Sequence, residues 1–112
     1  MKINVYSIFD EAAKAYITPF FMQNNALATR AFKDQCNTPG SQIASNPEQF
    51  VLFHIAEYDD STGTIVPRDT PRSLGRGNAY SEREAETRAI DDLLSEIRIL
   101  ADSVEKLTYK EK

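Results

Sequence analysis

The sequence predicts an α+β fold, in which a small, mainly antiparallel four-stranded sheet and one packed helix (β-β-α-β-β) precede a long C-terminal amphipathic helix. Apolar alternation before residue 23 and an apolar run at residues 50–58 indicate strands, and a helical apolar period at residues 26–36 indicates a helix. A heptad repeat near the C-terminus indicates the long helix. The 112 residues thus divide into an α+β domain at 1–66, a linker or loop rich in Pro, Gly and Arg at 67–80, and a helix at 81–112.

The first two strands are predicted before residue 23. Residues 2–9 alternate between polar and apolar side chains and include β-branched types such as Ile3. Residues 10–14 interrupt this pattern as a turn or a short helical loop. The extended pattern resumes from Ala15 to Met22, where Pro19 has no N–H to donate to a neighbouring strand. We therefore expect the second strand to be irregular or to lie at an edge of the sheet.

The packed helix is predicted over Ala26–Cys36. Asparagine at positions 24 and 25 is a good N-cap, because its side chain accepts a hydrogen bond from a free backbone N–H of the first turn. Apolar residues then recur at helical spacing, and the turn-forming residues 37–41 end the helix. Asn46-Pro47-Glu48 predicts a further capped single turn, with proline at the first helical position.

Phe50–Tyr58 is the strongest strand signal in the chain. The segment is apolar on both faces, which is typical of a central strand. Asp59–Gly63 predicts a hairpin loop, and Thr64–Val66 returns as a short strand. Residues 67–80 then hold two prolines, two glycines and three arginines, a composition that predicts a linker or an ordered loop.

An unbroken apolar stripe with alternating spacings of three and four residues runs along the C-terminal helix. β-branched residues occupy each a position and leucine occupies each d position, a combination that favours a parallel two-stranded coiled coil. We therefore expect a homo-oligomer, with a dimer favoured. Its interface is predicted to comprise Ile90, Leu93, Ile97, Leu100, Val104 and Leu107.

The same stripe has a second interpretation, in which the helix packs back on the sheet of its own chain. Leu94 and Ala101, at e positions, widen the stripe, as is common in globular domains and larger bundles. Ile99, at an outer position, would stay exposed in a two-stranded coil and indicates a further contact. The polar segment before the helix and the strict heptad register favour self-association.

Composition excludes several classes of protein. The net charge is −4, of which −3 falls in residues 81–112, unlike a protein that coats nucleic acid without preference. The single cysteine, Cys36, and the single histidine exclude a disulfide scaffold and a zinc site of the usual Cys/His kind. One cysteine also fits a reducing cytoplasm. No apolar run approaches the length of a bilayer span and no signal peptide is evident, so we expect no membrane contact.

Three arginines, Arg68, Arg72 and Arg76, recur every four residues, and Asp69 is the only acid among them. Spaced guanidinium groups on a loop can follow a phosphate backbone. Tyr80 could stack on a base of a single strand. The three arginines and Tyr80 are therefore candidate nucleic-acid contacts. In the alternative interpretation, the arginines form ion pairs with the acidic C-terminal helix.

No constellation of residues predicts catalysis. His54 lies mid-strand between apolar neighbours, and Cys36 lies near a helix C-terminus, where the helix dipole disfavours a thiolate. Asp59 and Asp60 beside Glu57 do not have the spacing of a calcium-binding loop. We expect a non-enzymatic protein with no catalytic residues, no metal site and no cofactor.

An ordered set of short motifs over roughly residues 1 to 77 resembles one known family. The matching residues are Tyr16, Thr18-Pro19-Phe20-Phe21, Asn25, Ala28, Arg30, Phe32, Asn37, Pro39, Asn46-Pro47-Glu48, Leu52-Phe53, Ile55, Glu57, Asp59-Asp60, Gly63, Thr70-Pro71 and Ser73-Leu74-Gly75. They resemble the small nonstructural proteins of microviruses, in the gokushovirus branch, which are encoded by single-stranded DNA bacteriophages (Microviridae). The C-terminal helix is not part of this pattern.

The resemblance implies a DNA-binding or DNA-synthesis accessory factor in the host cytoplasm, which helps to switch replication from duplex copying to single-strand production. It implies single-stranded DNA, or phage and host replication proteins, as partners beside a second copy of the chain. The net negative charge keeps an alternative open, an adaptor that binds phage or host proteins without contacting DNA. A structural or scaffolding role in the virion is a further alternative.

Overall fold

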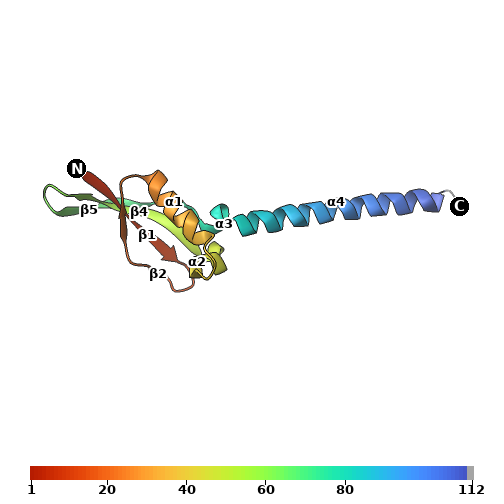
Figure 1. Cartoon of the computed structure of the whole chain (residues 1–112), viewed down its shortest axis with the longest axis horizontal. Coiled ribbons are helices and arrows are strands. Elements are labelled where there is room, and N and C mark those ends of the chain that lie inside the picture. The colour runs from red at the N-terminus through yellow and green to blue at the C-terminus, as the bar shows by residue number, and fades with distance from the viewer. Residues whose placement is uncertain (111–112) are drawn as a thin grey trace. The chain divides into compact units, whose positions relative to one another are not determined.

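The computed structural model describes residues 1–110, with side chains given except at position 84 and from position 108 onward (Figure 1). Residues 111–112, the end of the predicted C-terminal helix, lie outside the described residues. The chain forms two compact units, Met1–Ser81 and Glu82–Lys112, and each is described by itself. The predicted fold class is confirmed, because the first unit is an α+β domain with an antiparallel sheet and the second contains the long helix α4 (Glu82–Lys110).

The strands of the first unit pair antiparallel in a single sheet of order β2-β1-β4-β5, and β3 also pairs with β1. β4 pairs along its length with β1 on one side and with β5 on the other, which confirms the central position predicted from its two apolar faces. The strands are β1 (Lys2–Asp10), β2 (Ala15–Tyr16), β3 (Phe20–Met22), β4 (Phe50–Asp59) and β5 (Thr64–Arg76).

The second predicted strand consists of two short strands, so the sheet has five strands rather than four. β2 and β3 both pair with β1, and residues 17–19 between them, which include Pro19, form no strand, although the N–H of Ile17 donates to the carbonyl of Ile8 at 2.9 Å. Proline offers no N–H to the sheet, which explains the break. The hydroxyl of Ser7 donates a hydrogen bond to the carbonyl of Ile17 at 2.8 Å and holds the interrupted segment against β1.

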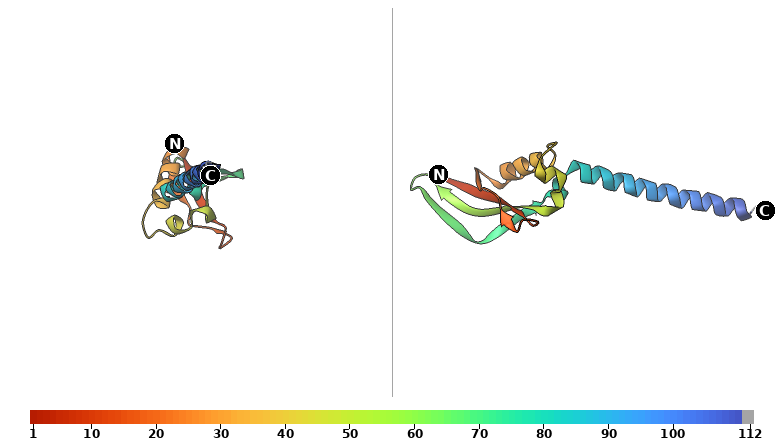
Figure 2. Two further views of the ribbon diagram at one scale, coloured as in Figure 1. Left: turned by 90° about the vertical axis from the view of Figure 1, so that its right-hand side faces the viewer. Right: turned by 90° about the horizontal axis from the view of Figure 1, so that it is seen from below.

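The packed helix is α1 (Asn25–Cys36), which matches the predicted helix and lies along one face of the sheet (Figure 2). The side chain of Asn24 caps it by accepting a hydrogen bond from the N–H of Leu27 at 2.9 Å. Ala28, Phe32 and Cys36 recur every four residues and are buried against the sheet. We call the side of the sheet that α1 covers the α1 face.

The hydrophobic core lies between the α1 face and the helical segments of the first unit. Three short segments accompany α1, namely α2 (Gln42–Ser45), the 3-10 turn η1 (Pro47–Gln49), which was predicted, and α3 (Gly77–Tyr80). The sheet contributes alternate residues of β1 and β4, as expected for strands with one side chain in two facing the core. The buried core comprises Tyr6, Ile8, Ala28, Phe32, Cys36, Ile43, Phe50 and Leu52.

The structure does not contain the linker that the composition of residues 67–80 predicted. β5 continues through this segment to Arg76, and α3 follows it directly. Two prolines are tolerated because β5 lies at the edge of the sheet, where one side of the strand needs no partner. Ala56 pairs with Pro67 whereas His54 pairs with Arg72, so β5 carries extra residues in a bulge between these pairs.

Candidate nucleic-acid interface

The candidate arginines lie on an edge strand, which fixes the side of the sheet that each one occupies. Arg72 pairs with His54 across β4 and β5, and directly paired residues of an antiparallel sheet share a face. His54 packs against the core residue Tyr6, with 5.1 Å between ring centroids. Arg72 therefore belongs to the α1 face, at its uncovered margin beside β5.

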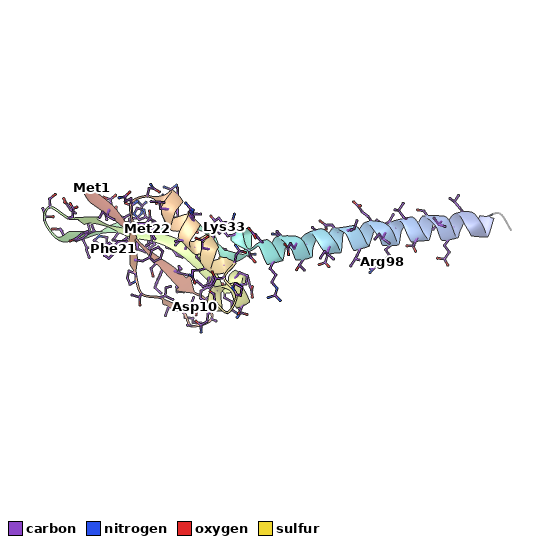
Figure 3. All side chains as sticks on the ribbon, in the orientation of Figure 1. Met1, Asp10, Phe21, Met22, Lys33 and Arg98 are labelled. Atoms are coloured by element: carbon purple, nitrogen blue, oxygen red, sulfur yellow. The ribbon has the colours of Figure 1, made fainter. Side chains whose placement is uncertain are left out.

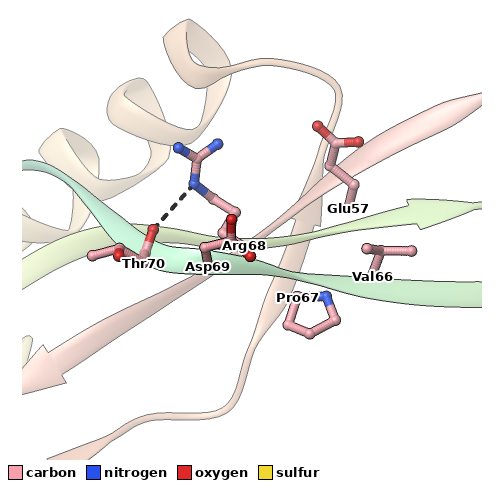
Figure 4. Close-up of a pocket in the computed structure, with 6 residues that line it drawn as sticks. All are labelled: Glu57, Val66, Pro67, Arg68, Asp69 and Thr70. Carbon is pink, nitrogen blue, oxygen red and sulfur yellow. Dashed lines mark hydrogen bonds between the residues drawn. The ribbon is translucent and has the colours of Figure 1, made fainter.

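Arg68 lies in the bulge of β5, where its Nε donates a hydrogen bond to the carbonyl of Thr70 at 3.4 Å. Its guanidinium projects from β5 on the same side as the carboxylate of Glu57 (Figure 4). An open cavity of about 470 Å³ adjoins this stretch and is lined by Glu57, Val66, Pro67, Arg68, Asp69 and Thr70. Two of these residues, Glu57 and Asp69, are acidic and would repel a phosphate inside the cavity. An anion would therefore approach Arg68 from the solvent side.

The charges of Arg68 and Arg72 both affect the pKa of the His54 side chain. The ring is buried, and its Nε2 donates a hydrogen bond to the carbonyl of Ala56 at 3.0 Å. Burial lowers the pKa of His54 from its ordinary value of 6.5, and the positive charges of Arg68 and Arg72 lower this pKa further. The imidazole is therefore neutral at pH 7. Neither arginine forms an ion pair with a described residue, so both charges are available to an anionic ligand.

Arg76 is engaged within the first unit. Its guanidinium donates to a carboxylate oxygen of Glu11 at 2.8 Å and to the carbonyl of Glu48 at 2.7 Å. The hydrogen bond from Arg76 lowers the pKa of the Glu11 carboxyl from its ordinary value. The acid offsets the charge of Arg76, so the three regularly spaced arginines do not form one uniform cationic row.

Tyr80 is partly buried and packs against the core. Its hydroxyl donates a hydrogen bond to the carbonyl of Leu74 at 2.6 Å, and its ring meets that of Phe32 edge-on, with 5.8 Å between centroids. The ring also occupies the space beside Gly75, where a Cβ would lie 2.8 Å from it. These contacts engage much of the ring and its hydroxyl within the first unit, and the assignment of Tyr80 as a base contact stays a prediction.

The comparison with known protein families gives one match. A family described as "Phage ORF5 protein" matches residues 3–80, which is more than half of the chain. The chain belongs to the Phage ORF5 protein family. No curated protein and no solved structure matches the chain. The Phage ORF5 region includes the three arginines and Tyr80, and it ends just before α4.

The Phage ORF5 region also carries a surface that the sequence interpretation did not assemble. Rings from four strands lie on the side of the sheet opposite the α1 face, which no helix of the first unit covers (Figure 2). We call this surface the aromatic face. Its rings are those of Phe9, Tyr16, Phe21, Phe53 and Tyr58.

Strand pairing and ring contacts both support this placement. In the sheet, Phe9 pairs with Tyr16, and Phe21 pairs with Val5. The ring of Tyr16 lies 4.9 Å from that of Phe9 and 5.8 Å from that of Phe53, and the rings of Phe21 and Tyr58 are 5.6 Å apart. The period-two alternation of residues 2–9 was the available signal, because it places one set of side chains on each face.

Helix α4 lies outside the Phage ORF5 match, and its apolar stripe is exposed. The six predicted interface residues, from Ile90 to Leu107, are between 53% and 65% exposed. Side chains project outward along the helix, where Arg98 marks an outer heptad position (Figure 3).

The described residues show no further chemistry-bearing cluster. No group of three or more His, Cys, Asp and Glu that could hold a metal ion occurs among them. Cys36 is buried, and burial raises the pKa of its thiol to about 11, which keeps the sulfur protonated at neutral pH. Within the described part of the chain, no helix is long and apolar enough to cross a membrane.

Proposed function

We propose that this phage protein is a non-enzymatic accessory factor of a microvirus of the gokushovirus branch, which binds single-stranded DNA or the replication complex as a homo-oligomer in the host cytoplasm. The observation that carries the proposal is the pair of exposed arginines on the edge strand β5. Arg72 lies on the α1 face through its pairing with His54, Arg68 projects on the same side as Glu57 (Figure 4), and neither forms an ion pair with a described residue. Guanidinium groups in such positions can contact successive phosphates.

The distribution of charge favours the first unit as the DNA contact. Residues 81–112 carry a net charge of −3, whereas residues 1–80 carry −1. A polyanion would be repelled by α4 more than by the first unit. We therefore assign α4 to assembly and β5 to DNA. An oligomer presents several arginine pairs together, so weak individual contacts add to a higher avidity along one strand.

A salt titration of binding to a single-stranded oligonucleotide tests the arginine assignment. Each phosphate contact contributes about 0.7 to the slope of log affinity against log salt for single strands. We expect Arg68→Ala/Arg72→Ala to reduce the slope by about 1.4 for each copy that contacts the strand. Arg98→Ala, on α4, removes the same type of charge and serves as the matched control, with an unchanged slope. Undetectable binding at low salt, or equal slopes for all variants, would refute the proposal.

The alternative function is an adaptor for phage or host proteins that never contacts DNA. The net charge of −4 and the exposed apolar stripe of α4 favour it. Partners recovered from infected cells after nuclease treatment, together with no oligonucleotide binding by the purified chain, would select this function. Finding the protein in purified virions would instead select a structural role.

A further inference from the structure

The aromatic face combines two properties that are uncommon on a sheet surface exposed to water. It is apolar, with Tyr16 and Phe21 each 50% exposed. It also carries no charge along its β1 and β4 positions, since Ile3, Val5, Ser7 and Phe9 of β1 pair with Tyr58, Ala56, Phe53 and Val51 of β4. At its margin on β5, Arg76 pairs with Val51, and the carboxylate of Glu11 offsets the charge of Arg76. An antiparallel sheet that faces water on one side ordinarily carries polar residues there. An uncharged aromatic surface is instead typical of the centre of a protein interface.

The position of the arginines argues against DNA as the occupant of this face. Arg72 pairs with His54 and belongs to the α1 face, and Arg68 acts on the same imidazole. Arg76 is held by Glu11. A strand of DNA stacked on the aromatic face would therefore find few available cations beside it, although single-strand sites combine stacking with a cationic groove.

We propose that the aromatic face packs against the same face of a second copy of the chain. Identical patches related by a two-fold axis contact one another without any further complementary surface. Two copies that each carry a net charge of −4 repel at a distance, but a face whose β1 and β4 positions are uncharged, and whose Arg76 is paired with Glu11, places no unpaired like charges in contact. Sheets that pack face to face interdigitate side chains across about 10 Å, and half-exposed rings suit that spacing.

The size of the face predicts a weak contact that depends on tethering. A fully covered aromatic side chain buries about 150–250 Å². Tyr16 and Phe21 are half exposed and the other three rings are less exposed, so the face offers roughly 300 Å² on each copy. A standard interface buries about 800 Å² on each partner, so the contact is weak between separate chains. The proposed coiled coil of α4, on which this step of the inference rests, would place two sheets at an effective concentration on the order of millimolar.

The test uses the full chain with the coil disrupted by Leu93→Asp/Leu100→Asp, and measures self-association by sedimentation equilibrium up to millimolar concentration. We expect weak residual dimerisation, and we expect the added change Phe21→Ser to raise its Kd at least tenfold. Val66→Ser is the matched control, because Val66 is a 59% exposed apolar residue that pairs with Glu57 on the other side of the sheet. It should leave the Kd unchanged, and circular dichroism verifies folding of each variant.

Three results would overturn the inference. The coil-disrupted chain would be monomeric at millimolar concentration, or Phe21→Ser and Val66→Ser would have the same effect. Loss of oligonucleotide binding by Phe21→Ser in the intact chain would also overturn it, because the aromatic face would then be a base-stacking platform. Failure of the proposed function is a separate outcome. It is measured by the salt titration, in which the chain carries none of these substitutions.

Discussion

Replacing one interface leucine of α4 tests whether the apolar stripe holds copies of the chain together. Leu100→Asp places a carboxylate at a d position of the heptad. Leu100 is 65% exposed in the single chain, so its replacement removes little packing from that chain. We expect the substitution to leave the first unit folded and to weaken self-association strongly.

The exposure of Leu100 sets the size of the effect. Full burial of a leucine side chain contributes about 1.5–3 kcal/mol. Covering the 65% of Leu100 that is exposed therefore contributes roughly 1–2 kcal/mol in each helix, or roughly 2–4 kcal/mol in a dimer. Because about 1.4 kcal/mol corresponds to a tenfold change in affinity, the Kd should rise roughly 30-fold to 700-fold. Burying two carboxylates would increase it further.

Sedimentation equilibrium over micromolar to millimolar concentrations measures this change. Ser95→Asp is the control, because it adds the same charge at an exposed outer position of α4 and should leave the dimer intact. The reasoning is refuted if Leu100→Asp and Ser95→Asp give the same Kd, or if the unchanged chain is already monomeric at tens of micromolar.

Four further predictions address the first unit. Gly77→Ala should destabilise the fold by about 1–3 kcal/mol in urea unfolding, because its Cβ would overlap the carbonyl oxygen of Pro47; unchanged stability would place α3 away from η1. Tyr80→Phe should cost about 1 kcal/mol in urea unfolding by removing the hydrogen bond to the carbonyl of Leu74, and unchanged stability would contradict a contribution from this bond. The pKa of His54 is lower in the folded chain than its ordinary 6.5. The neutral ring therefore contributes its full stabilisation above pH 6.5, and this contribution is lost as the pH falls toward the folded pKa. His54→Gln should flatten this part of the plot of stability against pH, and a plot identical to that of the unchanged chain would contradict the prediction. Arg76→Ala should reduce the salt slope of oligonucleotide binding less than Arg72→Ala, because Glu11 already pairs with Arg76, and an equal reduction would show that the ion pair opens on binding.

Local signals were sufficient to predict most of the first unit. Apolar residues on both faces of Phe50–Tyr58 predicted the central strand, and β4 spans Phe50–Asp59. Capping asparagine and helical periodicity predicted α1, and Asn24 makes the expected hydrogen bond. In both cases the residues that form the element also contain its signal, so tertiary packing did not need to be known.

The extent of β5 and the two faces of the sheet depend on contacts between distant residues. Pro67 and Pro71 have the composition of a loop, but an edge strand with a bulge tolerates them, and only the pairing with β4 shows this. Tyr80 resembled an exposed ring because its partners, Phe32 and Leu74, are assigned only once α1 and β5 are packed. The placement of Arg72 on the face opposite the exposed rings required the register of β4 against both neighbours.

The affinity of the full chain for a long single-stranded oligonucleotide at low salt tests the central claim most directly, when it is measured beside that of Leu93→Asp/Leu100→Asp. Linked arginine pairs predict detectable, strongly salt-dependent binding by the unchanged chain, and binding at least tenfold weaker once the coil is disrupted. The account of a DNA-binding oligomer is contradicted if the unchanged chain does not bind, or if both chains bind with the same affinity.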